Sequence, residues 1–245
     1  MTIFLQATVE GLSLAAIYSL VAIGFVLIYK SMDVLSFAQP ALAVVGAGII
    51  SSLAVDRGLP FLPALFLAIF LTGFLSLVIE RTFLRPMVGE PVFSVAVLTI
   101  GIDILLRTFL DSWIGINPRY LGDPFPNYGT LGSVNIGGIN LKYLEIAALI
   151  TAIVLIAILS IFFKRSKYGV AMRATSFDQE AALAQGINVG RIFGLVWFIA
   201  GILAAFSGFF MTGGFNTLSQ FSFVKALRAL PAVVIGGLDS IPGAV

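Results

Sequence analysis

The feature that most restricts how this chain can fold is a series of long apolar runs that contain almost no charge. The longest of these runs, residues 192–224, has no charged residue at all. About 20 apolar residues, rising about 1.5 Å each as a helix, cross the hydrocarbon core of a bilayer. Only 11% of the chain is charged and 59% is hydrophobic, whereas soluble domains are about 25% charged. The runs therefore predict an integral membrane protein.

The order of the runs predicts an all-α, polytopic membrane fold with about seven to eight membrane segments, some broken or re-entrant. The longest run exceeds one span, and its MTGGFNTLSQ stretch predicts that a helix ends near Met211. The last segment, residues 224–245, contains several Gly and Pro breaks and is typical of a kinked or re-entrant element. The remaining predicted spans are residues 11–29, 34–55, 58–79, 92–113 and 146–163.

Two residue types are absent, and their absence excludes several functions. The chain has no Cys and no His, so disulfides, thiolate metal sites and His-based catalysis are excluded. No G-x-x-x-x-G-K-[ST] phosphate-binding loop occurs either. The sequence therefore predicts no enzyme activity and no cofactor, metal or nucleic acid in this chain.

The placement of cationic residues between the runs predicts an orientation. If the loops between spans alternate between the two sides of the membrane, one side carries eight Lys and Arg residues and the other carries three. The side with more cations is expected to be the cytoplasm. This assignment predicts an N-terminus outside the cell membrane (the inner membrane), an extracytoplasmic loop at about 114–141 and a cytoplasmic loop at about 164–190, within one domain of residues 1–245. The richer set is Lys30, Arg81, Arg85, Lys164, Arg165, Lys167, Arg173 and Arg191; the poorer set is Arg57, Arg119 and Lys142.

The predicted cytoplasmic loop contains RATSFDQEAALAQGINVGR, a polar and helix-prone stretch between apolar runs. Ser176 followed by Gln179 is a capping box, and Gly186 is a suitable residue to end a helix. These signals predict a helix at about 176–185. Asp178 and Glu180 would lie in its first turn, where the helix dipole favours anions.

The same helix is expected to present an apolar face made of Phe177, Ala181 and Ala184. A helix this short is marginal in water by itself, so it must dock on a neighbouring surface. The spacing of the apolar residues does not decide between two interpretations. The helix either packs on its own membrane domain or docks on a cytoplasmic partner.

The segment EAALAQG, with Glu180, Ala181, Ala182 and Gly186, resembles the EAA-xxx-G signature of ABC import permeases. In those families this loop forms a coupling helix that lies in a groove of the ATP-hydrolysing subunit. The resemblance implies ABC ATPase subunits as partners, with Ser176, Asp178, Glu180, Ala181, Ala182 and Gly186 as the coupling residues.

Other stretches resemble one branch of that superfamily, the branched-chain amino acid permeases of the LivH type. They are GLSLAAIYSLVAIGFVLIYKSMDVLSFAQPAL, IERTFLRPMVGEPVFSVAVLTIGI, YGVAMRATSFDQEAALAQGINVGRIFGLVWFIAGILAAFSGFF and GGLDSIPGAV. The resemblance implies an importer of branched-chain or other small amino acids, with a second permease subunit and an extracytoplasmic substrate-binding protein. Similar proteins continue past Val245, so the chain is expected to be truncated at its C-terminus.

The sequence leaves three alternatives to that function. Urea or short amides are the alternative cargo, because similar permeases carry them. An ion-coupled secondary transporter would use Asp103 and broken helices, but its inverted repeats are not evident and it gives no reason for the EAA segment. A membrane-embedded enzyme would need clustered catalytic groups, which the sequence does not offer.

Six residues are candidates for the translocation path. Ser36, Phe37, Gln39 and Pro40 interrupt the second predicted span. Where the family often reads N-F-A-H-G, residues 36–40 read SFAQP, so Gln39 and Pro40 stand in place of His and Gly and the hydrogen-bonding chemistry differs. Asp103 and Arg107 lie four residues apart on the fourth span and can form an ion pair. Intramembrane charges usually face the protein interior, so this pair either lines the path, for example as a zwitterion site, or is structural.

The run AVVGAGIISS, after the interrupted segment, places small residues on one helix face. Ala43, Gly46 and Ala47 are spaced so that another helix can approach closely. Helix association is the expected role of this face.

Overall fold

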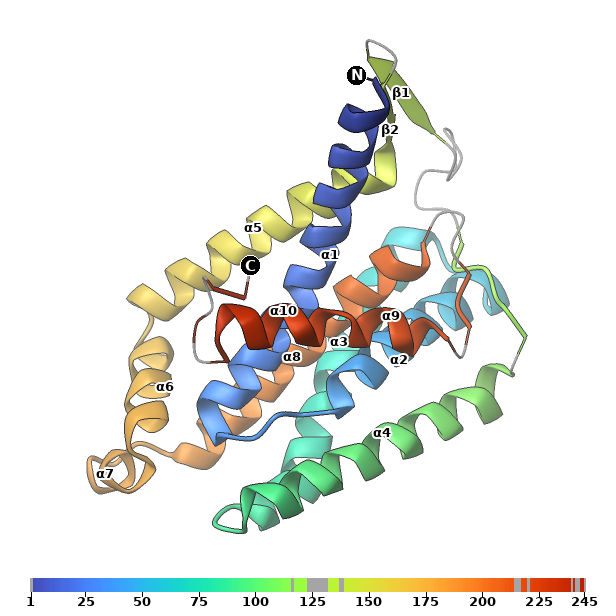
Figure 1. The fold of residues 1–245 in the computed structure, drawn as a ribbon. Helices are drawn as coiled ribbons and strands as arrows, with labels where there is room; N and C mark the ends of the chain where they lie inside the picture. The colour runs from blue at the N-terminus through green and yellow to red at the C-terminus, as the bar shows by residue number, and fades with distance from the viewer. Residues whose placement is uncertain are drawn as a thin grey trace.

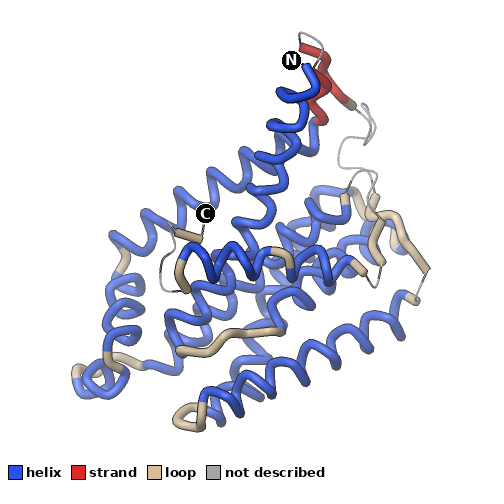
Figure 2. Tube along the Cα trace, viewed as in Figure 1, coloured by secondary structure: helices blue, strands red, loops and turns tan. Residues whose placement is uncertain are grey.

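The computed structural model describes residues 2–115, 117–122, 132–136, 139–213, 217–219, 221–238, 240 and 243–244. Helices make up most of this described part, and its strands form one small antiparallel hairpin (Figure 2). The predicted all-α membrane fold is confirmed.

Six helical segments in the described residues are long and apolar enough to cross a membrane. Two of them continue beyond their α-helix: α2 through the π-turn η1 (Ser52–Asp56), and α3 through η2 (Glu80–Leu84) and η3 (Arg85–Met87). The six helices are α1 (Thr2–Met32), α2 (Ala38–Ser51), α3 (Phe61–Ile79), α4 (Val92–Ile114), α5 (Tyr143–Arg165) and α8 (Val189–Thr212).

The expected count of seven to eight membrane segments is not confirmed. After α8 the chain forms α9 (Ser222–Leu227) and α10 (Ala229–Gly236), each too short to span a bilayer. α8 ends at Thr212, which confirms the predicted helix end near Met211. The turn predicted after it falls largely on 214–216 and 220, outside the described residues.

The centre of the fold is α8, which packs against α1, α2 and α3 (Figure 1). A Cβ added to Gly208 would lie 1.9 Å from the Ala43 carbonyl oxygen, and one added to Gly46 would lie 2.8 Å from the Ala205 Cα. Backbones this close require small residues on both helices. The expected role of the small-residue face of α2 in helix association is therefore confirmed.

Burial separates central from peripheral helices. All residues of α2 are buried, whereas α4 and α5 expose large apolar side chains such as Phe93, Phe109 and Ile153. In a membrane protein such faces can contact lipid or another subunit.

One end of the structure carries the N-terminus and the hairpin of β1 (Ser133–Ile136) and β2 (Ile139–Lys142) (Figure 1). Gln6 on α1 is hydrogen-bonded to the backbone of Asn140 through both its amide nitrogen and its amide oxygen. Much of the predicted loop at 114–141, residues 123–131, lies outside the described residues. We refer to this end as the hairpin end.

The opposite end carries α6 (Lys167–Phe177) and α7 (Gln179–Ala184), beyond the membrane helices (Figure 1). The eight cations of the richer set all lie near this end. They occupy the last turns of α1 and α5, follow α3, belong to α6 or lie in the first turn of α8. The three cations of the poorer set lie at the hairpin end. The structure thus keeps the two sets apart.

Candidate functional site

The segment predicted as one helix at 176–185 is two helices in the structure. Asp178 is extended (φ −157°) between α6 and α7, and its carboxylate accepts a hydrogen bond from the Ala181 amide at 2.9 Å. The predicted capping box at Ser176 is therefore wrong, since Ser176 lies inside α6. The physical reason is that Ser166 already caps α6 at its start, where it accepts from the Gly169 amide.

Gly186 ends α7 as predicted. Its φ is +79°, and the amides of Gly186 and Ile187 donate to the carbonyls of Leu183 and Ala182. This pair of bonds is the Schellman arrangement, which needs a left-handed residue after the helix and so favours glycine.

The buried face of α7 differs from the predicted one. Ala182 is buried against Val189, Phe193 and Met32, whereas Phe177, Ala181 and Ala184 are exposed. The break at Asp178 changes the helical register, so a periodicity counted through Phe177 selects the wrong face.

The opposite face of this region is an exposed surface that we call the α7 knob, made of Phe177, Glu180 and Leu183. Phe177 is 94% exposed and Leu183 is 57% exposed. Glu180 is also exposed, one turn before Leu183. Large exposed apolar side chains next to a charge are typical of a protein interaction surface.

An ion pair ties the start of α8 to the end of α3. The Arg85 guanidinium donates through Nε and Nη2 to the two Glu80 carboxylate oxygens, at 3.1 and 3.0 Å. Its Nη2 also donates to the Gly190 carbonyl at 2.6 Å. The Glu80 side chain is fully buried. A buried carboxylate needs such a partner, so Arg85 links the segment just after α7 to a membrane helix.

The residues predicted to interrupt the second span lie before and at the start of α2. Phe37 is the residue before the helix, and Pro40 lies in its first turn, where a missing amide N–H leaves no helical bond unmade. The Phe37 amide donates to Thr99 Oγ1 of α4 at 3.1 Å. The prediction of a broken span is thus corrected: α1 ends at Met32, and α2 starts after a short connection.

Gln39 is fully buried and joins three helices. Its Nε2 donates to the Ala200 carbonyl of α8 at 3.0 Å. It also lies against α1 at Gly24, where an added Cβ would lie 2.0 Å from the same nitrogen. Gln39 Oε1 and Ser36 Oγ are buried without a hydrogen-bond partner. Gln39 therefore has a packing role in this conformation.

Asp103 and Arg107 form the predicted ion pair on α4, with Arg107 Nη2 donating to Asp103 Oδ2 at 2.5 Å. The Asp103 side chain is buried, whereas that of Arg107 is 37% exposed. The Arg107 guanidinium lies over the ring of Phe223, 4.1 Å from its centroid. Such cation–π contacts stabilise a desolvated guanidinium.

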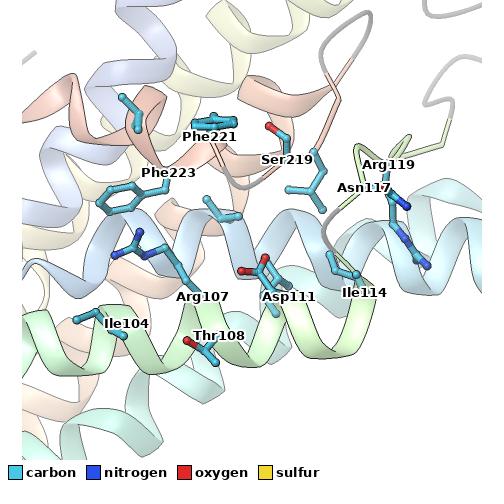
Figure 3. Close-up of a pocket in the computed structure, with 15 residues that line it drawn as sticks. Ile104, Arg107, Thr108, Asp111, Ile114, Asn117, Arg119, Ser219, Phe221 and Phe223 are labelled. Atoms are coloured by element: carbon cyan, nitrogen blue, oxygen red, sulfur yellow. The ribbon is translucent and has the colours of Figure 1, made fainter.

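Arg107 opens onto a pocket of about 400 Å³ between α4, α2 and the segment around α9. Figure 3 shows Arg107 and Asp111 extending from α4 toward Phe223 and Ser219. Asp103 does not line this pocket, and neither do the four residues around the start of α2. The lining residues are Val44, Ile104, Arg107, Thr108, Leu110, Asp111, Ile114, Gly115, Asn117, Arg119, Leu218, Ser219, Phe221, Phe223 and Val224.

Sequence reasoning missed Asp111 and Phe223 at this pocket. Asp111 was detectable, because it continues the four-residue spacing of Asp103 and Arg107 on one helix face. Phe223 had no such signal, since it comes from a segment distant in sequence. Within the described residues, no three His, Cys, Asp or Glu side chains lie close enough together to hold a metal ion.

Six apolar helices around a centre of small residues define this chain as a multi-pass helical membrane protein. The chain belongs to the family of branched-chain amino acid transport system permease components, whose family model matches residues 7–245.

Curated relatives match nearly the whole chain. The high-affinity branched-chain amino acid transport system permease BraD of Pseudomonas aeruginosa is 27% identical over 99% of this chain and 82% of the relative. LivH of Escherichia coli is 26% identical over the same shares. A probable LivH permease of Methanocaldococcus jannaschii is 24% identical over 94% of this chain and 75% of the relative. No solved structure matches the chain significantly.

Proposed function

We propose that the chain is the membrane-spanning permease subunit of an ABC importer for branched-chain or other small amino acids, driven by ATP hydrolysis on partner subunits. The observation that supports this most is α7: an EAA-xxx-G helix, capped at both ends, with one face packed on the membrane domain and the other exposed. A second permease subunit and a substrate-binding protein complete the proposed assembly.

The coupling residues have distinct proposed roles in α7. Asp178 starts the helix and Gly186 ends it, so the two together fix its length. Ala182 holds the helix on Phe193 and Met32. Glu180 and Ala181 are exposed and would contact the ATPase. Ser176 belongs to α6, so its proposed role is limited to the surface beside α7.

A displacement of α7 can be transmitted to the membrane helices through a few direct contacts. Ala182 contacts the first turns of α8, and Gly190 accepts the hydrogen bond from Arg85. A movement of α7 would therefore displace α8 and the end of α3 together. A nucleotide-dependent contact at α7 can in this way bias a membrane domain that has two arrangements.

The orientation follows from the same assignment. The α6–α7 end would face the cytoplasm and the hairpin end the outside of the inner membrane, in agreement with the positive-inside rule. The loops at about 164–190 and 114–141 would then be the coupling loop and the outer cap of one permease domain, residues 1–245. Asp103, Arg107 and the residues around Gln39 lie along α2 and α4, which we propose to border the translocation path.

The direct test is uptake of radiolabelled leucine by proteoliposomes that contain this permease with its second permease, its ATPases and its binding protein. We expect uptake only when ATP is present on the side of the membrane that carries α6 and α7. Replacing ATP by a non-hydrolysable analogue should stop the uptake. Urea at the same concentration is not expected to be taken up. Leucine uptake by the permease alone, driven by an ion gradient without ATP, would overturn the proposal in favour of a secondary transporter.

A further inference from the structure

Three exposed cations lie where the membrane helix α5 turns into α6, and we call them the elbow cations: Lys164, Arg165 and Lys167. The chain has no Asp or Glu between Glu145 and Asp178. Within the part of the chain that the structure describes, none of the elbow cations forms an ion pair. Their positive charge is therefore available to a partner outside this chain.

The turn between α5 and α6 is fixed by close contacts. The Ser166 amide donates to the Phe162 carbonyl at 2.9 Å, and the Ser166 hydroxyl accepts from the Gly169 amide at 2.9 Å. The Arg173 guanidinium donates to the Phe163 carbonyl at the end of α5. A Cβ added to Gly169 would lie 2.7 Å from the Phe162 carbonyl oxygen, so α6 begins directly against the backbone of α5. The backbone that carries the elbow cations is therefore held in one arrangement.

The length of α5 places the elbow cations at the surface of a bilayer. Its uncharged run, residues 146–163, is about 27 Å long as a helix, and the hydrocarbon core of a bilayer is ~30 Å thick. Lys164 and Arg165 are the next two residues. Tyr168, beside Lys167, is 59% exposed, and tyrosine is enriched at membrane–water interfaces. The elbow cations thus lie at the depth of phospholipid headgroups.

An apolar stripe on α5 leads to these cations. Its residues are spaced four, four and three apart, so they share one helix face, and all are exposed: Ile150, Val154, Ile158 and Ile161. Arg165 lies four residues after Ile161 and continues the same face by one turn. A chain of methylene groups can lie along this stripe with its charged end beside the elbow cations.

We propose that the elbow cations and the apolar stripe together bind an anionic phospholipid of the surrounding membrane. The cations contact the phosphate of the headgroup, and Ile158 and Ile161 contact an acyl chain. Clusters of Lys and Arg directly after a membrane helix are typical of sites for anionic lipids. This surface goes beyond the proposed function, because it involves neither the cargo nor ATP.

The stripe favours a lipid over other anionic partners. A soluble phosphate would contact the cations but would gain nothing from Ile158 and Ile161. An acidic surface on a soluble subunit would contact the cations without reaching the hydrocarbon depth at which the stripe lies. A phospholipid provides a negative headgroup and an apolar chain in the order in which α5 presents their partners.

The absence of Cys from the chain allows a fluorescent reporter on the stripe. Ile161→Cys is labelled with bimane, and the purified protein is placed in nanodiscs of phosphatidylcholine. About one lipid in ten is then replaced by brominated phosphatidylglycerol or by brominated phosphatidylcholine, and either lipid quenches bimane on contact. From the quenching we expect phosphatidylglycerol to bind at least about fivefold more strongly, which is about 1 kcal/mol, the typical contribution of one Lys or Arg at a membrane surface.

A second reporter on the same face is the control for position. Ile150→Cys lies about 16 Å from Ile161 along α5, in the half of the helix nearer the hairpin end. Both brominated lipids are expected to quench this reporter equally. A preference for phosphatidylglycerol at Ile150→Cys as strong as that at Ile161→Cys would contradict a site at the elbow.

Neutral variants test the cations directly. The triple variant Lys164→Gln, Arg165→Gln and Lys167→Gln, in the Ile161→Cys background, is expected to lose the preference for phosphatidylglycerol. Arg57→Gln removes an exposed cation at the hairpin end and should leave the preference unchanged. A folded triple variant that keeps the full preference would overturn the proposal.

Salt tests the same charges without any substitution in them, and so applies even if the triple variant does not fold. Raising the salt concentration from 0.1 to 1 M shortens the Debye length from about 10 to about 3 Å. The preference at Ile161→Cys is therefore expected to fall toward one. A preference that does not change with salt would show that charge does not produce it.

Two further arms separate the lipid from other partners. Glycerol phosphate, the headgroup without acyl chains, should leave the quenching unchanged at the concentration of the lipid; displacement would assign the cations to a free phosphate. Adding the ATPase subunits should also leave the preference in place, whereas its loss would assign the cations to a protein interface. If neither brominated lipid quenches Ile161→Cys, the stripe is covered by protein and the proposal is wrong.

Discussion

Replacing Gly208 by valine is expected to prevent the membrane domain from assembling. Gly208 of α8 faces the backbone of α2, and an added Cβ would lie 1.9 Å from the Ala43 carbonyl oxygen and 2.7 Å from its carbon. Backbone atoms cannot move aside as a flexible side chain can, so α2 and α8 must separate. Overpacking typically costs about 1–3 kcal/mol and occasionally more, and we expect the upper end here because the atoms that the added Cβ would meet belong to the backbone of Ala43.

The measurement is the yield of monodisperse protein in detergent and its melting temperature. At about 3 kcal/mol the folding equilibrium shifts by roughly a hundredfold, so we expect little folded Gly208→Val. Gly101→Val is the matched control, since Gly101 lies within α4 with no atom within 4 Å of an added Cβ. Equal yields and melting temperatures for the two variants would contradict the close packing of α2 on α8.

Replacing Gly186 by valine is expected to reduce ATP-driven uptake about tenfold while the protein still inserts and folds. The φ of Gly186 is +79°, and an added Cβ would meet no other part of the protein within 4 Å. The substitution is therefore expected to act through backbone strain and not through a clash with surrounding side chains. An L-residue in the left-handed region costs about 1–2 kcal/mol, more for a β-branched one, and 1.4 kcal/mol is about tenfold in population. The end of α7 is then lost in most molecules.

Gly186→Asn is the control for this variant, because asparagine tolerates the left-handed conformation far better. Uptake by Gly186→Asn should remain close to that of the unmodified protein. Glu180→Lys should also reduce uptake, since it reverses an exposed charge in the first turn of α7. Normal uptake and normal ATPase binding in both Gly186→Val and Glu180→Lys would contradict the assignment of α7 as the coupling helix.

Most of the membrane fold could be predicted from the sequence, because a bilayer requires long apolar helices and little else satisfies that requirement. The runs at 92–113 and 146–163 differ from α4 and α5 mainly at their ends. Apart from the small-residue face of α2 and the charged residues of α4, the exposure pattern within each run was not predictable, since a lipid-facing and a protein-facing surface of a membrane helix are both largely apolar.

The coupling region shows a different limit. Both Ser176 and Asp178 are good helix caps, and local propensity does not decide between them. Which residue caps α7 depends on where α6 begins. Ser166 caps the start of α6, and this helix extends to Phe177, so Ser176 lies inside it and Asp178 becomes the cap of α7. The signature EAA-xxx-G gave the correct residues for the end of α7, because Gly186 has a conformational requirement that no neighbour can override.

The pocket beside Arg107 could be identified only from the tertiary structure. Arg107 and its partner Asp103 were recognisable from their spacing, but the aromatic ring over Arg107 comes from α9, more than a hundred residues later in sequence. Gln39 shows the reverse case: a polar residue in a membrane segment suggested a path residue, and the structure instead places its side chain between Gly24 and Ala200.

The central claim, that α7 receives the ATPase, is tested most directly by site-specific crosslinking in the purified transporter. Leu183→Cys on the α7 knob, in a chain that otherwise has no Cys, is treated with a short thiol-to-amine reagent, with Ser133→Cys on β1 as the control. We predict an adduct with the ATPase subunit from Leu183→Cys and none from Ser133→Cys. An assembled complex in which Leu183→Cys forms no ATPase adduct, or in which Ser133→Cys forms it instead, would contradict the account.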